Sequence, residues 1–347
     1  MYTTLSVLLP LVLLAVSVAA LAADAPPAAA ARKPDAPWRA IHVMTGSAES
    51  LDRLEAQLPA LAALGANVIV CEVNYNFDYS SHPELKAHAG AITKAAARKF
   101  VAACRRQGIR AIPQLNCLGH QSWQANTAAL LKAHPEFDET PGQFPGNKGI
   151  YCRSWCPQHP EVNKVVFALM DELLDAFEAD AFHVGMDEVF LVGSEHCPRC
   201  KGQDPAKLFA KAVADYHGHL AGKGVQMLMW GDRLIDAKAT GLGEWEAATN
   251  GTAPAADLIP KDIIICPWHY NKREEYRSIP ALLAKGFRLL PAGWNKPDAV
   301  EALIGYALAQ KDPRVLGYMA TTWSVDVRKI SEYPPLIRGM EKMAAPR

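Results

Sequence analysis

Two adjacent carboxylates, Asp187 and Glu188, follow a short apolar run and a glycine in the segment FHVGMDEVF, residues 182–190. The phenylalanine, valine and methionine residues around them make a merely solvated loop a poor explanation. If the surroundings hold both groups partly desolvated and close together, they cannot both ionise easily, and the pKa of one carboxyl rises. A carboxylic acid that remains protonated near neutral pH can protonate a glycosidic oxygen. The pair is therefore predicted to divide into a proton donor and an anion.

Other polar and aromatic side chains follow further apolar runs, at the positions where strands are expected to end. They are Glu72, Asn74, Tyr75, Asn116, Gly119, His120, Trp230, Asp232, Trp268, His269, Tyr270, Trp294, Asn295, Trp323 and Asp326. Tryptophan rings can stack on the apolar faces of sugars, and carboxylates and amides bind hydroxyls, so these residue types favour a carbohydrate substrate. Trp230 and Trp323 could instead cap a hydrophobic core. A lone histidine such as His120 or His269 is more often a hydrogen-bonded structural residue than a catalyst.

The elements that must position these side chains alternate regularly along the chain. Strands are expected at residues 39–44, 67–73, 109–115, 181–185, 225–230, 263–267, 287–291 and 315–321. Helices are expected at residues 50–64, 95–107, 161–179, 205–221, 276–285 and 298–310. This alternation predicts an α/β fold, a single (β/α)8 TIM barrel, whose site lies where strands end and loops begin. A doubly wound open sheet is the alternative, but no Gly-x-Gly-x-x-Gly motif follows the first strand.

A long irregular segment, about residues 116–160, interrupts the alternation. Long loops in compact domains are usually functional or disordered. The segment contains Trp123 and Trp155, which favour order.

Composition and the N-terminus limit the class of protein. The 347 residues include 36 basic and 36 acidic side chains, so a zero net charge gives no support to nucleic-acid or membrane-surface binding. Residues 1–23 are predicted to be a signal peptide, with an uncleaved membrane anchor as the alternative. Residues 24–37 are an Ala/Pro-rich leader, and residues 38–347 are expected to form one catalytic domain. The mature protein is expected to be exported, periplasmic or extracellular, or lysosomal or secreted in a eukaryote, and free of the membrane.

Eight cysteines raise the question of disulfides or a metal site. Four of them lie in apolar surroundings and are expected to be small buried residues: Cys71, Cys104, Cys117 and Cys266. Cys197 and Cys200 form a CxxC pair that suits a zinc knuckle or a local disulfide, and Cys152 and Cys156 could complete a four-sulfur site. Their spacing is not that of a standard zinc finger. Disulfides, a structural zinc and free thiols therefore all stay open.

A family resemblance becomes visible at the carboxylate pair. Residues 183–188, HVGMDE, resemble the His-x-Gly-Gly-Asp-Glu signature of glycoside hydrolase family 20, the β-N-acetylhexosaminidases, with Met186 in place of the second glycine. Residues 112–120, IPQLNCLGH, resemble the family's Ile-Pro-Glu-x-Asp-x-Pro-Gly-His segment. Residues 156–162 are similar to its Cys-Pro-x-x-Pro-Glu-Val stretch, and residues 316–324 resemble its last strand. The matches follow the family's order along the chain.

This resemblance implies a TIM barrel with substrate-assisted retaining catalysis, an exception to the usual scheme of two flanking carboxylates. It implies that Glu188 is the general acid/base. Asp187 would orient the substrate's 2-acetamido group and stabilise the positive, oxazolinium-like intermediate. The implied partner is a glycan or glycoconjugate with terminal β-linked N-acetylhexosamine, and no cofactor or catalytic metal is implied. The expected substrate-binding residues are His120, His183, Trp230, Asp232, Trp268, Tyr270, Trp294, Asn295 and Trp323.

Three departures from the family pattern accompany the resemblance. The first strand, residues 41–46, lacks the arginine that grips sugar hydroxyls. Asn295 stands where a tyrosine follows the tryptophan of strand seven, and residues 323–325 lack the glutamate of the last strand. Tyr270 and Asp326 are candidates to replace the missing phenol and acid. These departures motivate a second hypothesis, a glycan-binding barrel without turnover, and a zinc-dependent hydrolase with Cys or His ligands is the third.

Overall fold

The structure is a computed structural model that describes residue 1 and residues 37–345. The predicted signal peptide and leader lie outside the described residues, apart from their first and last positions. Within the described residues, no helix combines the length and the apolar character needed to cross a membrane.

The strands form one parallel sheet that curls into a barrel. Their order across the sheet is β10-β11-β1-β2-β3-β6-β7-β8-β9. The bounds are β1 (Trp38–Met44), β2 (Val68–Glu72), β3 (Arg110–Cys117), β6 (Ala181–Gly185), β7 (Gln226–Trp230), β8 (Ile264–Cys266), β9 (Arg288–Leu289), β10 (Ala292–Gly293) and β11 (Gly317–Thr321).

The barrel closes through its seventh strand, which is split in two. Strand β9 pairs with β8 and β10 pairs with β11, and only Leu290 and Pro291 separate the two halves. The backbone N–H of Leu290 donates to the Ile265 carbonyl (2.9 Å), and the Pro291 carbonyl accepts from Met319 (2.9 Å). The chain therefore supplies eight parallel strand positions, which confirms the predicted barrel and rules out the open sheet.

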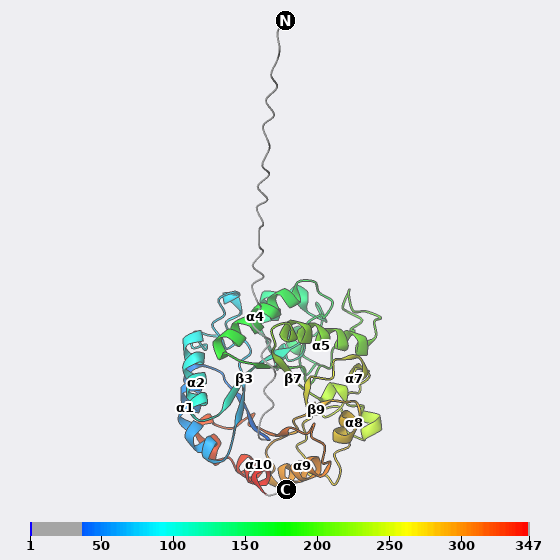
Figure 1. The fold of residues 1–347 in the computed structure, drawn as a ribbon. Helices are drawn as coiled ribbons and strands as arrows, with labels where there is room; N and C mark the ends of the chain where they lie inside the picture. Colours follow the sequence, from blue (N-terminus) through cyan, green and yellow to red (C-terminus); the bar gives the residue numbers. More distant parts are fainter. Residues whose placement is uncertain (2–36, 346–347) are drawn as a thin grey trace.

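Most of the helices lie around the sheet in sequence order, as Figure 1 shows. The α-helices of the described residues are α1 (Ala48–Ala63), α2 (Lys94–Arg106), α3 (Ala129–Ala133), α4 (Val162–Phe177), α5 (Pro205–Ala221), α6 (Ala237–Thr240), α7 (Ala255–Leu258), α8 (Ser278–Ala284), α9 (Pro297–Ala309) and α10 (Pro334–Ala344). Short 3-10 helices are η1 (Pro83–Leu85), η2 (Pro135–Phe137), η3 (Pro145–Asn147), η4 (Asp232–Leu234) and η5 (Val327–Glu332). The six predicted helices are all present. Helix α10 and the short helices were not predicted from the sequence.

Local sequence explains where these helices begin. Helix α1 starts with a reciprocal capping box between Ser47 and Ser50 and buries leucines at helical spacing toward the sheet. Helix α5 begins with Asp204, whose side chain accepts from the Ala206 backbone N–H, and continues with proline at its first position.

The buried residues form two layers. Alternate strand residues, among them Val68, Val70, Leu228 and Trp230, form a cluster inside the barrel. Their neighbours along the strands belong to the larger cluster that also contains the helix residues. Cys71, Cys104, Cys117 and Cys266 are all buried, as predicted.

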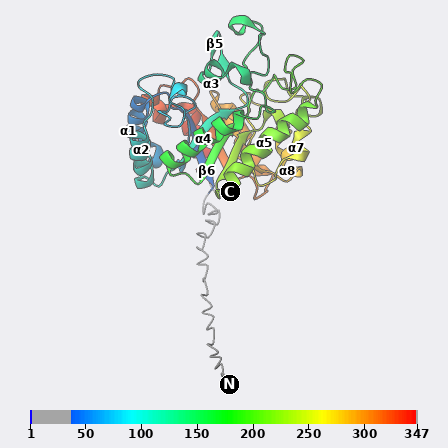
Figure 2. The same ribbon diagram turned by 90° about the horizontal axis from the view of Figure 1, so that it is seen from above.

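The long segment between β3 and α4 is ordered, as predicted, and holds a small hairpin of β4 (Ser122–Trp123) and β5 (Asn126–Thr127). Trp155 is buried, and its Nε1 donates to the hydroxyl of Tyr216 (3.1 Å). Trp123 is 56% exposed and does not anchor the segment. Figure 2 shows β5 and α3 at the end of the barrel opposite the C-terminus.

Candidate active site

The segment that carries Asp187 and Glu188 leaves strand β6 through a tight backbone turn. Gly185, Met186 and Glu188 have φ values of 67°, 71° and 50°, in the left-handed region. A Cβ atom on Gly185 would lie 2.6 Å from Oδ1 of Asn116, so only glycine fits against strand β3 there. Left-handed conformations of Met186 and Glu188 are strained, and such strain is typical of functional sites.

His120, after strand β3, connects the two carboxylates. Its Nε2 lies 3.1 Å from Oδ2 of Asp187 and 3.2 Å from Oε2 of Glu188. Burial lowers the pKa of His120, but the charge of Asp187 and hydrogen bonds to both carboxylates outweigh it, and the net pKa is well above its usual value. His120 is therefore an imidazolium that offsets the repulsion within the pair.

Asp187 is correspondingly held as an anion. Burial raises the pKa of Asp187, but the charge and hydrogen bond of His120 outweigh burial, so the net pKa is below the usual value. Its Oδ2 pairs with His120, and among the described residues none donates a hydrogen bond to the buried Oδ1.

Asp232, which follows strand β7, forms a hydrogen bond with the backbone of the pair. Its Oδ2 accepts from the backbone N–H of Glu188 (2.8 Å) and from Nε of Arg233 (2.7 Å). Its Oδ1 accepts from Nε1 of Trp268 (3.2 Å). Burial raises the pKa of Asp232 to about 6, and the charge of Asp187 adds to the rise while Arg233 opposes it. Asp232 is therefore a carboxyl with a raised pKa beside the predicted pair.

Four aromatic side chains from three strand ends form one wall of the site. Trp268 and Tyr270 stack with centroids 5.0 Å apart, and Trp294 lies 5.3 Å from Tyr270. Nε1 of Trp323 donates to the hydroxyl of Tyr270 (2.8 Å). The structure thus brings four of the predicted substrate-binding residues into contact.

Three predicted substrate-binding residues are buried and not accessible to a ligand. His183 and Trp230 are fully buried, and Asp232 is 1% exposed. The ring of Trp230 packs against those of His183 (4.7 Å) and Trp323 (5.8 Å) and belongs to the cluster inside the barrel. The prediction that these three residues contact a sugar directly is therefore wrong. They lie buried behind the residues that line the site.

Two other candidates lie outside the contacts described above. Asn295 is exposed, and within the described residues no hydrogen bond joins it to the wall. Asp326 caps η5 and forms an exposed ion pair with Arg328 (2.6 Å).

His269 is a structural residue, as the alternative in the sequence analysis has it. It is 1% exposed, and Nε2 lies 2.6 Å from Oγ of Ser278. Its Nδ1 pairs with Glu246.

A polar network lies at the ends of strands β1 to β3. Oε1 of Glu72 accepts from the amides of Asn74 (2.9 Å) and Asn116 (3.0 Å). Its Oε2 accepts from Gln114 (3.1 Å) and lies 3.0 Å from Nε2 of His42. Glu72 is 5% exposed, so these predicted candidates hold strand ends in place.

A second aromatic group was missed by the sequence analysis. The ring of Tyr151 lies 4.9 Å from Trp245, 5.5 Å from Trp123 and 5.8 Å from Phe190. Trp123 and Trp245 are 56% and 45% exposed, so they are not part of the hydrophobic core. Burial and then the charge of Glu188 raise the pKa of Tyr151, so this group lies beside the pair.

A cavity of about 240 Å³ adjoins this group. Its lining includes Asn74, Tyr75, Asn116, His120 and Trp123. Trp123 and Tyr151 lie in the long segment at residues 116–160, which the sequence predicts to be ordered, whereas Trp245 carries no sequence signal.

Comparisons with known proteins agree with the geometry. The model of the family described as "Glycosyl hydrolase family 20, catalytic domain" matches residues 53–334. A β-hexosaminidase of Akkermansia muciniphila is 34% identical over 120 residues, which cover 33% of this chain and 22% of that protein. A β-hexosaminidase of Vibrio furnissii is 26% identical over 214 residues, 61% of this chain and 31% of that protein. The chain thus spans less than a third of the length of either relative.

Solved structures show the same fold. The chitobiase of Flavobacterium johnsoniae superposes with a TM-score of 0.67 at 20% sequence identity, over 88% of this chain and 48% of that chain.

Proposed function

Because the chain belongs to glycoside hydrolase family 20, we propose that it is a glycosidase that removes terminal β-linked N-acetylhexosamine by substrate-assisted retaining catalysis. The observation that carries the proposal is the contact of one histidine with both carboxylates. Nε2 of His120 lies 3.1 Å from Oδ2 of Asp187 and 3.2 Å from Oε2 of Glu188. This contact keeps Asp187 charged, as an anion that could accept a hydrogen bond from the acetamide N–H of a substrate.

The proposed reaction has two steps. In the first, the acetamide oxygen of the substrate attacks the anomeric carbon, the bond to the leaving oxygen breaks, and Glu188 gives that oxygen a proton. In the second, Glu188 takes a proton from water, which attacks the anomeric carbon and opens the oxazolinium-like ring. The acid is thereby regenerated, and the net change is hydrolysis with retained configuration.

The charges around the pair support this division of roles. The positive charge that develops on the acetamide nitrogen needs an anion within hydrogen-bonding distance. His120 keeps the pKa of Asp187 below its usual value despite burial, so Asp187 is that anion near neutral pH. Asp232 holds the backbone of Glu188 and thereby positions the proton donor.

The aromatic residues support a sugar substrate. The wall formed by Trp268, Tyr270, Trp294 and Trp323 offers apolar faces to the terminal sugar. Tyr151, Trp123 and Trp245, beside Glu188, are the surfaces that a leaving group would meet. The substrate is accordingly a glycan or glycoconjugate, whose leaving part extends over exposed tryptophans.

The test measures hydrolysis of 4-nitrophenyl N-acetyl-β-glucosaminide and of its galacto isomer. We expect activity on at least one of these substrates, and we expect Glu188→Gln to lose it. NMR should show that the first product has the β configuration. The proposal would be wrong if the folded protein were inactive on both substrates and on a wider panel of glycans. A first product of α configuration would overturn retention alone.

A binding role without turnover is the second candidate. It is favoured by residues 323–325, which lack the glutamate of the family's last strand, while the nearby carboxylate of Asp326 pairs with Arg328 (2.6 Å). Calorimetry would then detect sugar binding that Glu188→Gln leaves unchanged, with no hydrolysis. Measurable turnover removes this candidate.

We also propose that the protein is exported. The support is the apolar run within residues 1–23 and the small-x-small pattern at residues 20–22. Expression of the full chain should give an exported product whose N-terminus lies near residue 24, as read by N-terminal sequencing. An intact N-terminus in the membrane fraction would favour an anchor.

A further inference from the structure

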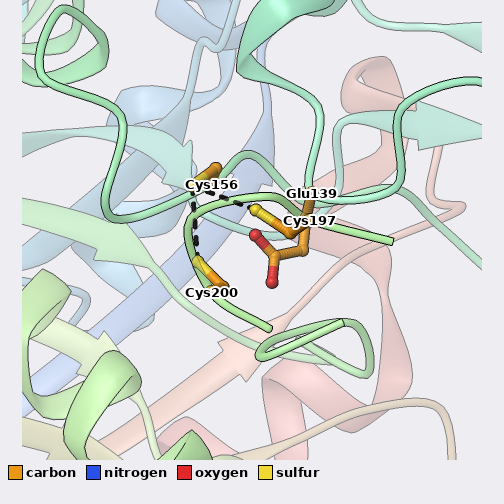
Figure 3. Close-up of side chains that lie close together, drawn as sticks. All are labelled: Glu139, Cys156, Cys197 and Cys200. Atoms are coloured by element: carbon orange, nitrogen blue, oxygen red, sulfur yellow. Dashed lines mark hydrogen bonds between the residues drawn. The ribbon is translucent and has the colours of Figure 1, made fainter. Parts of the chain in front are cut away.

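Four side chains that take no part in the proposed reaction meet in one buried cluster. They are Glu139, Cys156, Cys197 and Cys200, and one ligand atom of each lies within 4.8 Å of all the others. Sγ of Cys156 is 3.4 Å from that of Cys197 and 3.3 Å from that of Cys200. Figure 3 shows the three sulfurs together with the Glu139 carboxylate turned toward them.

The cluster corrects part of the sequence expectation. Cys152 was predicted to complete a four-sulfur site, but its Sγ lies 3.6 Å from the backbone carbonyl oxygen of Glu188 instead. Glu139, which the sequence analysis did not consider, occupies the fourth position.

Glu139 gives an independent sign of a ligand. The residue is fully buried, and its Oε1 accepts from the backbone N–H of Ser194 (2.9 Å). Among the described residues, none donates to its buried Oε2. A buried carboxylate oxygen without a partner is costly, because it has lost the water that would solvate it. A cation shared with the neighbouring sulfurs would satisfy it.

We propose that Glu139, Cys156, Cys197 and Cys200 bind a zinc ion. Zinc takes four ligands in tetrahedral geometry and accepts both thiolate sulfur and carboxylate oxygen. Thiolates about 2.3 Å from a tetrahedral zinc lie about 3.8 Å apart, whereas disulfide sulfurs lie about 2.05 Å apart. The distances of 3.3 and 3.4 Å are much closer to the first value.

The backbone brings the two cysteines of the CxxC pair together in a tight turn. The N–H of Cys197 donates to the Ser194 carbonyl, and that of Lys201 to the Cys197 carbonyl (3.0 Å each).

All four ligands are buried, which leaves no position open to a substrate and indicates a structural ion. The ion would join two segments of the site. Glu139 and Cys156 belong to the segment that also carries His120. Cys197 and Cys200 follow the catalytic pair on the loop after β6. A zinc ion here would hold both segments in register.

The decisive measurement is the metal content of the full-length protein, purified without chelators and dialysed against a trace of zinc. About one zinc per chain is expected. Cys200→Ser and Cys156→Ser should retain less than about a tenth of it, and Glu139→Gln should lose zinc faster to a competing chelator. Cys152→Ser is the matched control and should keep the full amount.

A second measurement does not depend on the variants folding. Cobalt exchanged into the wild-type protein should give thiolate charge-transfer absorption and the visible bands of a tetrahedral ion. Mass spectrometry of the alkylated protein reports whether any disulfide joins the three cysteines.

Several results would overturn the proposal. They are no zinc in the dialysed wild-type protein, iron in its place, a disulfide within the cluster, or full zinc in a folded Cys156→Ser variant. None of these readouts uses glycosidase activity. A failure of the proposed function would therefore leave the zinc assignment standing, and the reverse also holds.

Discussion

Nε2 of His120 donates a hydrogen bond to Oδ2 of Asp187 over 3.1 Å. The same nitrogen lies 3.2 Å from Oε2 of Glu188, so one cation contacts both members of the pair. Two adjacent carboxylates are tolerated in this buried position because His120 supplies the charge that offsets their repulsion. The two residues can then differ in role, with Asp187 kept as an anion.

His120→Gln should shift the pH dependence of catalysis. Burial continues to raise the pKa of Asp187 in this variant, while the charge that lowers it is lost. Because catalysis needs Asp187 ionised, the acid limb of kcat should move to higher pH. The alkaline loss caused by deprotonation of His120 should disappear, and kcat at neutral pH should fall about 100-fold.

The measurement is a pH–rate profile of both proteins. His217→Gln is the control, since His217 pairs with Asp262 (2.9 Å) and contacts no residue of the site. An acid limb that stays in place in His120→Gln would contradict the assigned role of His120.

Asp187→Asn and Glu188→Gln should respond differently to the leaving group. A dinitrophenolate leaves without protonation, so Glu188→Gln should lose much less activity on the dinitrophenyl glycoside than on a natural disaccharide. Asp187→Asn should lose about 100-fold or more on both, because the acetamide must be held in either case. Comparing kcat/KM for the two substrates checks this. Equal losses in both variants would remove the division of roles.

Asp232 should make the protein less stable as the pH rises. Its folded pKa of about 6 lies above that of an unfolded aspartate near 4, so the folded state binds the proton more tightly. The contribution of Asp232 to the free energy of unfolding should therefore decline through this window by roughly 2 to 3 kcal/mol. Burial lowers the pKa of His183 to about 3, so His183 acts in the opposite direction over the same window: its contribution is lost as the pH falls below about 6.5. The share of Asp232 is therefore read from a comparison of wild type with Asp232→Asn. The lowered pKa of Asp187 also opposes Asp232, but only below about pH 4.

Urea unfolding of wild type and variants at pH 4.5 and pH 7 measures this contribution. Relative to wild type, Asp232→Asn should gain roughly 2 to 3 kcal/mol of stability at pH 7 compared with pH 4.5. Asp257→Asn, which removes an exposed carboxylate paired with Lys285, should keep the wild-type difference between the two pH values. The same slope in wild type and Asp232→Asn would show that Asp232 does not carry the effect.

The barrel could be predicted from the sequence because parallel strands are buried on both faces and form apolar runs. Strand β6 (Ala181–Gly185) and helix α5 (Pro205–Ala221) have the predicted bounds. The sequence predicts one strand at residues 287–291 and does not reveal that the seventh strand is split. Its division depends on which neighbour each half pairs with.

The site was predictable where it depends on strand ends and not where it depends on long loops. The ends of β3, β6 and β7 must meet in a barrel, so His120, Asp187 and Asp232 could be placed together from sequence. Tyr151 and Trp245 come from loops far apart in the chain, and only tertiary packing brings their rings to 4.9 Å. The burial of a side chain at a strand end could not be predicted from sequence either. Trp230 was predicted to bind substrate, but it lies inside the barrel.

Gly185→Ala should lower the free energy of unfolding. A comparison with Gly108→Ala separates the steric clash from the backbone strain. Gly185 and Gly108 have nearly the same left-handed φ, 67° and 68°, so alanine is strained at both positions. At Gly108 a Cβ meets nothing within 4 Å, whereas at Gly185 it lies 2.6 Å from Oδ1 and 2.9 Å from Cα of Asn116. Gly108→Ala should therefore cost about 1 kcal/mol, and Gly185→Ala about 3 kcal/mol or more. Because strand β6 must move to relieve the clash, Gly185→Ala should also lower kcat while Gly108→Ala does not. Urea unfolding and kinetics of the two variants decide the matter, and equal unfolding costs would mean that the close approach of β6 to Asn116 places no constraint on the catalytic pair.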